Sequence, residues 1–295
     1  MAGIETIGFI GLGVMGEPIC RNLTKKSGRS VVAFDLAKEP LQRLRADGAT
    51  VAPTAARVVE QADVVFFCLP SGKHVQALFE DAGGVLEVAR AGQIFVDLGT
   101  SPVKLTRDLA EKLRRKAAEF ADAPIARTRE AAINGTLSVM LGATPALFAM
   151  LEPLIRCFAT EVTLCGDTGA GQVTKIMNNM VLFQTVNALS EAYVIAKRSG
   201  VDPKLLFETL AKGSADSFAL RNHGLKAVIP GAFPERAFST EYALKDLGYA
   251  LDLAADVGLD ARGSRLVGEI LRETIEAGFA REYWPVIAKV IDRKA

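Results

Sequence analysis

Short runs of β-branched and aromatic residues alternate with helical patterns over about the first 165 residues of the chain. Several runs are apolar at successive positions, which is typical of parallel strands covered by helices on both faces. Between them, residues 104–118 place leucines four positions apart, as on one face of a helix. The runs that predict strands are TIGFI (6–10), SVVAFD (30–35), DVVFFCL (63–69), QIFVDL (93–98), EFADA (119–123) and LSVMLG (137–142). Repeated strand–helix–strand units of this kind predict a doubly wound α/β domain.

The pattern changes after Cys165. A glycine-rich stretch, GDTGAGQ (166–172), contains Asp167 and Thr168, either of which can cap a following helix. No proline interrupts residues 173–199, which predict one helix of about 27 residues, or roughly 40 Å. Its apolar residues lie all round, so we expect it to be buried on most sides. The chain is therefore expected to form an α/β domain over residues 1–165 and an all-helical domain over 166–295, built on this long helix.

Composition narrows the possible partners. A chain of 295 residues suggests about two domains, and 35 basic against 34 acidic residues give no support for binding to nucleic acid or anionic lipid. No apolar run reaches the roughly 18 residues of a membrane span, and the N-terminus lacks the pattern of a signal peptide. Four cysteines show no CxxC spacing and the two histidines lie far apart, so we expect no metal site. Free thiols are typical of a reducing cytoplasm, where we expect the protein.

A dinucleotide motif follows the first predicted strand. Gly11, Gly13 and Gly16 have G-x-G-x-x-G spacing, and a helical pattern begins directly afterwards. The first glycine permits a tight turn, the second allows close approach of a pyrophosphate, and the third allows helix–strand packing. We therefore expect a Rossmann-type domain whose cofactor contacts the turn, Gly11, Leu12, Gly13, Val14, Met15 and Gly16.

The second predicted strand ends at Asp35, where a carboxylate would accept hydrogen bonds from the adenosine ribose. This favours NAD, although nearby Lys38 and Arg43 are able to serve the extra phosphate of NADP. Two later strand ends should face the same cofactor. Leu69 and Pro70 are expected to line the nicotinamide side, and Thr100 to offer a hydroxyl near the carboxamide.

The long helix carries polar residues near its start. Lys175 and Asn179 are four residues apart on one face, with Asn178 beside them. A lysine and an amide on a largely apolar helix are costly unless they serve a purpose or reach solvent. A lysine that extends into solvent at the helix start is the alternative.

Four ordered motifs resemble the β-hydroxyacid dehydrogenase family, whose members include 3-hydroxyisobutyrate dehydrogenase. They are GFIGLGVMG (8–16), DAPIART (122–128), GAGQVTKIMNN (169–179) and KDLGYALDLA (245–254). The resemblance implies that Lys175 is the catalytic acid/base, that Asn179 orients the substrate, and that Lys245 lies near the nicotinamide, with Asp246 helping to hold it. Burial and a neighbouring cation would lower the pKa of such a lysine. The resemblance, together with the largely apolar long helix, predicts a homodimer or homotetramer.

The substrate motif departs from the family pattern. Most relatives carry V-S-G-G after D-A-P, whereas this chain has an arginine and a threonine at the two glycine positions, Arg127 and Thr128. The change resembles the sulfolactaldehyde reductase branch. A guanidinium presents a fork of donors to a carboxylate or sulfonate, and the Thr128 hydroxyl adds another. The alternative is a surface arginine paired with Glu130.

The expected function is NAD-dependent interconversion of a small anionic β-hydroxy acid, or hydroxysulfonate, and its semialdehyde. An imine reductase and a non-catalytic dinucleotide-binding module are the alternatives, and Lys175 argues against both. Near the C-terminus, Tyr283 and Trp284 either form a wall of the substrate pocket or simply pack.

Overall fold

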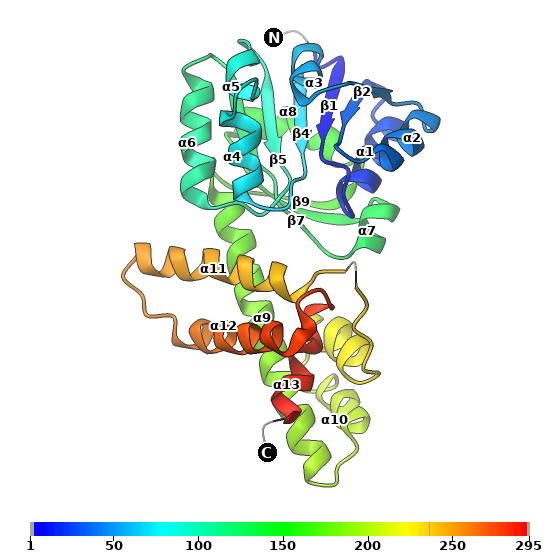
Figure 1. The fold of residues 1–295 in the computed structure, drawn as a ribbon, viewed down its shortest axis with the longest axis vertical. Helices are drawn as coiled ribbons and strands as arrows, with labels where there is room; N and C mark the ends of the chain where they lie inside the picture. Colours follow the sequence, from blue (N-terminus) through cyan, green and yellow to red (C-terminus); the bar gives the residue numbers. More distant parts are fainter. Residues whose placement is uncertain (1–2, 236, 294–295) are drawn as a thin grey trace. The chain divides into compact units, whose positions relative to one another are not determined.

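A computed structural model describes residues 3–235 and 237–293, and divides the chain into two compact units, Met1–Lys175 and Ile176–Ala295. The first unit is an α/β domain, and the second is built from helices (Figure 1). The family-typical fold predicted from the sequence is therefore confirmed. The long helix α9, Ala170–Arg198, begins in the first unit and continues into the second.

The sheet of the first unit has the strand order β3-β2-β1-β4-β5-β6-β8-β7, and β9 pairs with β8. The strands from β3 to β6 are parallel, which is the order 3-2-1-4-5-6 of a dinucleotide-binding fold. Their bounds are β1 Thr6–Ile10, β2 Ser30–Phe34, β3 Thr50–Val51, β4 Val64–Phe67, β5 Ile94–Asp97, β6 Glu119–Asp122, β7 Ile125–Ala126, β8 Leu137–Gly142 and β9 Ala159–Gly166.

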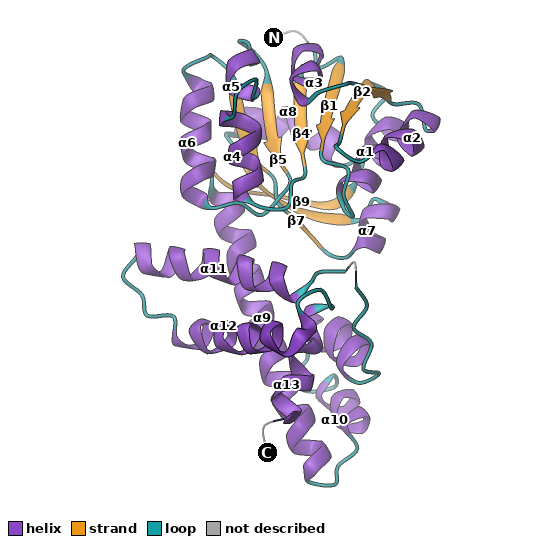
Figure 2. Ribbon diagram, viewed as in Figure 1, coloured by secondary structure: helices purple, strands orange, loops and turns teal. Residues whose placement is uncertain are grey.

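Three of these strands were not predicted. Strands β3 and β7 have only two residues each, too few to show an alternating pattern. Strand β9 has eight residues, but most of its side chains are exposed or half-buried, so its sequence lacks a buried face. Strands β7 and β8 are antiparallel and extend the sheet beyond β6 (Figure 2).

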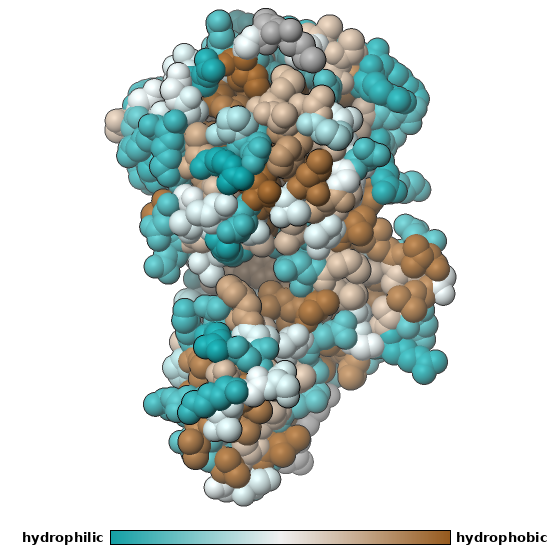
Figure 3. Space-filling view, turned by 180° about the vertical axis from the view of Figure 1, so that it is seen from behind, coloured by the Kyte–Doolittle hydropathy of each residue, from teal (hydrophilic) through white to brown (hydrophobic). Residues whose placement is uncertain are grey.

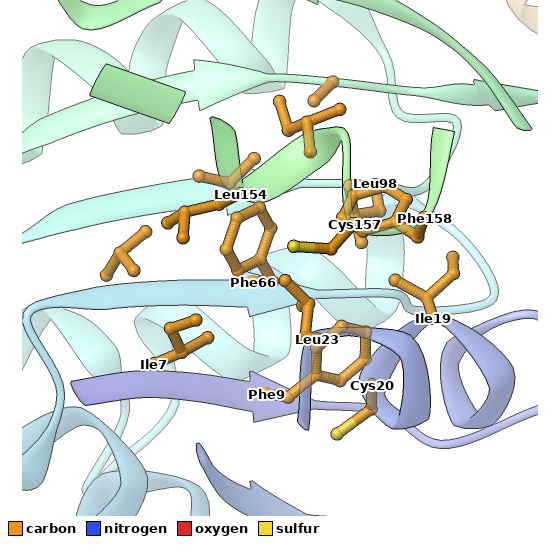
Figure 4. Packing of buried hydrophobic residues seen from close by; sticks show 14 of the residues in the cluster. Ile7, Phe9, Ile19, Cys20, Leu23, Phe66, Leu98, Leu154, Cys157 and Phe158 are labelled. Carbon is orange, nitrogen blue, oxygen red and sulfur yellow. The ribbon is translucent and has the colours of Figure 1, made fainter. Parts of the chain in front are cut away.

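Helices cover both faces of the sheet. They are α1 Gly16–Lys26, α2 Lys38–Ala46, α3 Ala55–Gln61, α4 Gly72–Glu80, α5 Val85–Val88, α6 Val103–Arg114, α7 Arg129–Asn134 and α8 Pro145–Ile155. Alternate residues of each strand enter different cores, because side chains alternate across a sheet. Phe9 and Phe66 pack with α1 and α8 on one face, whereas Phe67 packs with α4 and α6 on the other. Figure 4 shows the first core, in which the thiols of Cys20 and Cys157 are buried among aromatic and aliphatic side chains.

Over its described residues, the second unit contains the remainder of α9 and seven further helical segments. They are α10 Pro203–Leu210, η1 Leu220–Val228, α11 Thr240–Asp256, α12 Arg262–Thr274, η2 Ile275–Phe279, η3 Trp284–Val286 and α13 Ile287–Arg293. Its centre holds Phe183, Leu247 and Trp284, all fully buried. Over the described ranges, no helix is both long and apolar enough to span a membrane.

Candidate active site

The turn between β1 and α1 has the geometry that its three glycines predict. Gly11 has a φ of +91°, and a methyl group there would stand 2.5 Å from the carbonyl oxygen of Cys68. At Gly16, a methyl group would collide with the carbonyl oxygen of Gly11. At Gly13, by contrast, it would meet no described atom within 4 Å. The turn therefore packs tightly against the protein at Gly11 and Gly16 and leaves open space at Gly13, where a pyrophosphate fits.

Asp35 holds this turn in place. Its carboxylate accepts one hydrogen bond from the N–H of Leu12 at 2.5 Å and another from the N–H of Ala37 at 2.7 Å. The side chain of Leu12 is buried in the core, while Val14 is exposed and Met15 is half-buried. Within the described chain, no side-chain oxygen caps the start of α1, so this helix end suits an anion.

Glu17 lies in the first turn of α1, where its charge would repel a phosphate. Two arginines neutralise it, because Arg21 donates to its carboxylate at 2.8 Å and Arg43 donates at 2.7 and 2.8 Å. The hydrogen bond from Arg43 is the main cause that lowers the pKa of Glu17. Arg43 is therefore engaged within the protein, which bears on the choice between NAD and NADP.

The loops after β4 and β5 meet the glycine turn. A methyl group at Gly11 would stand 2.9 Å from the Leu69 side chain, and one at Gly99 would stand 3.1 Å from the Leu69 carbonyl oxygen. Leu69 and Thr100 are half-buried, whereas Pro70 is exposed. The structure therefore places Leu69 against both the glycine turn and the loop that carries Thr100.

The loop after β5, Gly99–Ser101, is fixed from two directions. From the sheet, Asp97 accepts the N–H of Gly99 at 2.8 Å and the Ser101 hydroxyl at 2.7 Å. From helix α9, the Gln172 side chain donates to the Gly99 carbonyl at 2.9 Å and accepts the Ser101 N–H at 3.0 Å. Asp97 and Gln172 are both completely buried. Thr100 is consequently presented by a loop with little freedom to move.

Asp122, the first residue of DAPIART, caps helix α9. One carboxylate oxygen accepts the N–H of Gly169 at 2.6 Å and the other accepts the N–H of Gln172 at 2.7 Å. The sequence indicates Asp167 or Thr168 as the cap of this helix. The Thr168 hydroxyl instead donates to the Phe120 carbonyl. The capping carboxylate therefore comes from a neighbouring strand, not from the residues directly before the helix.

The glycines of the G-x-x-G-x-G run have distinct structural roles. Gly166 and Gly169 have φ values of +131° and +97°, which favour glycine. Gly171 lies against the Met140 carbonyl and the Asp122 carboxylate, and any larger residue would collide with that carbonyl. The motif thus fits the start of α9 closely over the ends of β6 and β8.

Burial raises the pKa of Asp122 to about 6, despite the opposing hydrogen bonds from Gly169 and Gln172. Because its pKa is raised, this carboxyl stabilises the folded state when the pH lies below the ordinary pKa of an aspartate. The stabilisation is lost as the pH rises through about 6. Relative to Asp122→Asn, wild-type protein should lose about 2 kcal/mol of unfolding free energy between pH 4 and 7, at 1.36 kcal/mol per pKa unit, because an unfolded aspartate is already partly protonated at pH 4. Urea titrations of both proteins measure the difference in unfolding free energy. The contributions of the carboxylates that both proteins share cancel in this difference. A difference that is flat over this window would contradict the assignment, as would an Asp carboxyl carbon-13 signal that fails to titrate near pH 6.

Lys175 and Asn179 lie one turn apart on α9, as predicted, and Lys175 is half-buried. In the second unit, the buried Asn179 donates to the Asp246 carboxylate at 2.7 Å and accepts from Asn178 at 3.2 Å. Lys245 forms an ion pair with Asp246 at 3.0 Å. Its ammonium also lies 5.2 and 5.4 Å from the ring centres of Tyr242 and Tyr249. Asn179 is thus oriented by Asp246, whereas Asn178 is exposed.

Arg127 lies just after β7, with a φ of +84°. This left-handed conformation explains why a glycine suits the position. The guanidinium is exposed and donates from one nitrogen to the Thr136 carbonyl at 2.6 Å and to the Thr160 hydroxyl at 2.9 Å. Among the described residues, no carboxylate forms an ion pair with Arg127, so the alternative pairing with Glu130 is not observed. The next residue, Thr128, precedes α7 and its side chain does not cap that helix.

Tyr283 and Trp284 pack within the second unit. Trp284 is completely buried, and its ring centre lies 4.9 Å from that of Phe183. The Tyr283 hydroxyl lies 2.5 Å from Nδ1 of His223, and burial lowers the pKa of this histidine to about 4. The sequence left open whether these aromatics form a wall of the substrate pocket or simply pack, and Trp284 packs in the core of the second unit.

The sequence interpretation missed Asp97, Asp122 and Gln172 as members of the site. A signal exists for the two aspartates, because each is the second-last residue of a predicted strand, at the edge where ligands bind. Gln172 has no comparable signal, since its importance depends on a loop about 70 residues away.

The strand order and the open glycine turn define an NAD(P)-binding oxidoreductase domain. Residues 6–166 match the family described as the NAD-binding domain of 6-phosphogluconate dehydrogenase. Residues 169–288 match the one described as NAD-binding of NADP-dependent 3-hydroxyisobutyrate dehydrogenase. The chain belongs to the β-hydroxyacid dehydrogenase family, and is an NAD(P)-dependent enzyme acting on a CH–OH group.

Similar proteins span nearly the whole chain. 2-(Hydroxymethyl)glutarate dehydrogenase of Eubacterium barkeri is 32% identical over 96% of this chain and 94% of its own. The mitochondrial 3-hydroxyisobutyrate dehydrogenase of Mus musculus is 31% identical over 96% of this chain and 85% of its own. The structure of Mycobacterium tuberculosis 3-hydroxyisobutyrate dehydrogenase with L-serine superposes with a TM-score of 0.88 at 29% identity, covering 99% of this chain and 100% of the other.

Proposed function

We propose that this dehydrogenase interconverts a small anionic β-hydroxy acid and its semialdehyde, with Lys175 as the acid/base. The attachment of α9 to the Gly99–Ser101 loop carries this proposal. Gln172 contacts the loop directly, and Lys175 follows it by three residues, so both side chains lie on one helix face. This spacing supports the proposal that the Lys175 amine acts beside the predicted nicotinamide loop.

The chemistry needs one proton transfer at the substrate oxygen. A bound nicotinamide supplies the hydride acceptor for oxidation and the hydride donor for reduction. In oxidation, the neutral Lys175 amine accepts the hydroxyl proton as the carbonyl forms; in reduction, its ammonium donates a proton to the developing alkoxide. Asn179, fixed by Asp246, is proposed to orient the substrate, with Asn178 beside it.

The substrate acid group is proposed to bind Arg127 and Thr128. The Arg127 guanidinium is anchored by two neutral oxygens, so its positive charge is not neutralised by a described ion pair. Its remaining donors suit a planar carboxylate or a sulfonate. Carboxylates such as 3-hydroxyisobutyrate, 3-hydroxypropionate, glycerate and serine are candidate substrates. So is the sulfonate pair of sulfolactaldehyde and dihydroxypropanesulfonate.

NAD is the proposed cofactor in preference to NADP. Asp35 places a carboxylate at the end of β2, where it would repel a 2′-phosphate. Arg43 is bound to Glu17 by two hydrogen bonds and is thus withdrawn from serving that phosphate. Lys38 remains as a possible phosphate partner, so the preference is one of degree.

Replacing Arg127 with glycine tests the anion site. We expect the KM of the best anionic substrate to rise about 10- to 100-fold, because a hydrogen bond to a charged group contributes about 1.5–3 kcal/mol. Folding stability should change by less than about 1 kcal/mol, since glycine tolerates the left-handed backbone. The measurement is steady-state kinetics with NAD and NADP over the carboxylates and sulfonates named above and 2-(hydroxymethyl)glutarate.

Two comparisons make this test specific. The methyl ester of 3-hydroxypropionate carries no charge, so its KM should not respond to Arg127→Gly. The neighbouring exposed arginine provides the matched control, and Arg129→Ala should leave all KM values unchanged. An unchanged KM for the best anion in Arg127→Gly would remove Arg127 from the site. Absence of NAD(P) turnover with every compound would overturn the proposed substrate class.

The protein is further proposed to form a homodimer or homotetramer in the cytoplasm. Helix α9 is less buried than its sequence suggests, because Val181, Ala188 and Ile195 are exposed at seven-residue intervals along one face. Figure 3 shows hydrophobic side chains at the surface of the lower, helical part of the view. An apolar stripe of this kind supports association between copies of the chain.

A further inference from the structure

Two side chains attach the start of helix α9 to the first unit, and the proton-transfer chemistry uses neither. We name this pair, Asp122 and Gln172, the helix latch. Asp122 accepts the backbone N–H groups of Gly169 and Gln172 and so fixes where the helix begins. Gln172 donates to the Gly99 carbonyl at 2.9 Å and accepts the Ser101 N–H at 3.0 Å, and so fixes the helix against the loop that carries Thr100.

The latch is stiff because its groups have no alternative partners. Asp122 and Gln172 are both completely buried, so water cannot replace the hydrogen bonds that they make. The loop cannot yield toward the sheet either, since Asp97 holds Gly99 and Ser101 from the other side. A rotation or shift of the first turn of α9 would therefore break several buried hydrogen bonds together.

We propose that Gln172 is a positioning residue of the dehydrogenase, which sets the place of the Lys175 amine relative to the Gly99–Ser101 loop. Gln172 and Lys175 are three residues apart, so a displacement of one moves the other on the same helix face. Gln172 itself does not touch the reacting atoms. The inference rests on the proposed function, because it gives Gln172 a purpose only if Lys175 transfers the proton.

The first test removes both amide contacts and keeps the length of the side chain. In Gln172→Met, kcat should fall about 10- to 100-fold, since a displacement near 1 Å can reduce a rate about 100-fold. The Kd of NAD and the KM of the fastest substrate should each stay within about threefold of wild type. Loss of a residue that only supports folding would not lower kcat while leaving KM and Kd nearly unchanged.

The second test asks whether the two hydrogen bonds themselves matter. A protonated glutamate has one donor and one acceptor in the geometry of glutamine, and burial favours the protonated form. In Gln172→Glu, the ratio of its kcat to that of wild type should therefore rise as the pH is lowered. Gln172→Met has no such proton, so its ratio should not depend on pH.

The control removes a similar amide elsewhere on the same helix. Gln184 donates to the Ser264 hydroxyl at 3.1 Å, within the second unit, and Gln184→Met should leave kcat unchanged. A kcat within threefold of wild type in Gln172→Met would overturn the inference, as would a ratio in Gln172→Glu that stays as low as that of Gln172→Met at every pH. A loss of NAD affinity that matches the loss of kcat would instead make Gln172 part of the cofactor site, and would also overturn it.

Lys175→Met belongs in the same series, because it separates this inference from the proposed function. If Lys175→Met is inactive while Gln172→Met is fully active, only the positioning role fails. If Lys175→Met keeps wild-type turnover, the proposed proton transfer fails and the positioning role fails with it.

Discussion

Replacing Lys175 with alanine is expected to lower kcat about 10²- to 10⁴-fold, the usual contribution of a positioned acid/base group. NAD binding should be largely retained, because the proposed pyrophosphate contacts lie in residues 11–16, whereas Lys175 is proposed to act on the substrate oxygen. Isotopically labelled hydride transfer and steady-state rates measure the loss directly. The effect should be similar in both reaction directions, since the same group accepts and returns the proton.

Added amines provide the control for this variant. A small primary amine can occupy the space left by Lys175→Ala and perform the proton transfer, so ethylamine should restore part of the rate. An exposed lysine outside the site supplies the comparison, and Lys204→Met should retain full activity. Near-normal turnover in Lys175→Ala would refute the mechanism, whatever the substrate.

The second large effect is expected in the glycine turn. Gly16→Ala places a methyl group against the Gly11 carbonyl, so we expect a loss of about 1–3 kcal/mol in the free energy of unfolding, as in other overpacked sites. NAD binding should be lost together with stability, because relief of the collision displaces the turn. Chemical denaturation and calorimetric titration with NAD measure the two effects separately.

Gly13→Ala is the matched variant, and it should weaken NAD binding without lowering the stability of the fold. Its methyl group meets no described atom within 4 Å, and Gly13 is not among the glycines with positive φ. Folding stability should therefore stay equal or rise slightly, because alanine restricts the unfolded chain. The Kd of NAD should rise at least about 10-fold, since the methyl group occupies the space proposed for the pyrophosphate. Unchanged NAD affinity in Gly13→Ala would place the pyrophosphate elsewhere.

The sequence predicted most of the first unit because its strands are apolar on both faces and its helices are amphipathic. All six predicted strands begin and end within two residues of the observed bounds, and the predictions for β1 and β8 coincide with them. Strand β9 was not predicted, because its side chains are largely exposed and form no apolar pattern. The long helix was predicted from a stretch that no proline interrupts, although its exposed stripe was not predicted.

The candidate site was predictable where a motif fixes the backbone and not where distant segments meet. Gly11, Gly13 and Gly16 occupy the turn that their spacing indicates. The left-handed conformation of Arg127 was hidden, because arginine is not a residue that signals positive φ. The partnership of Gln172 with Ser101 depends on the tertiary fold, so no local pattern reveals it.

The left-handed backbone at position 127 also has a consequence for how this enzyme can diversify. The φ of +84° is accepted by glycine without strain, and by asparagine more readily than by most residues. Exchanges there can change the charge and size of the side chain while Thr136 and Thr160 remain in place to receive it. A library restricted to this single codon would therefore vary the side chain on an unchanged backbone path, and would test directly whether position 127 sets the substrate range, as proposed.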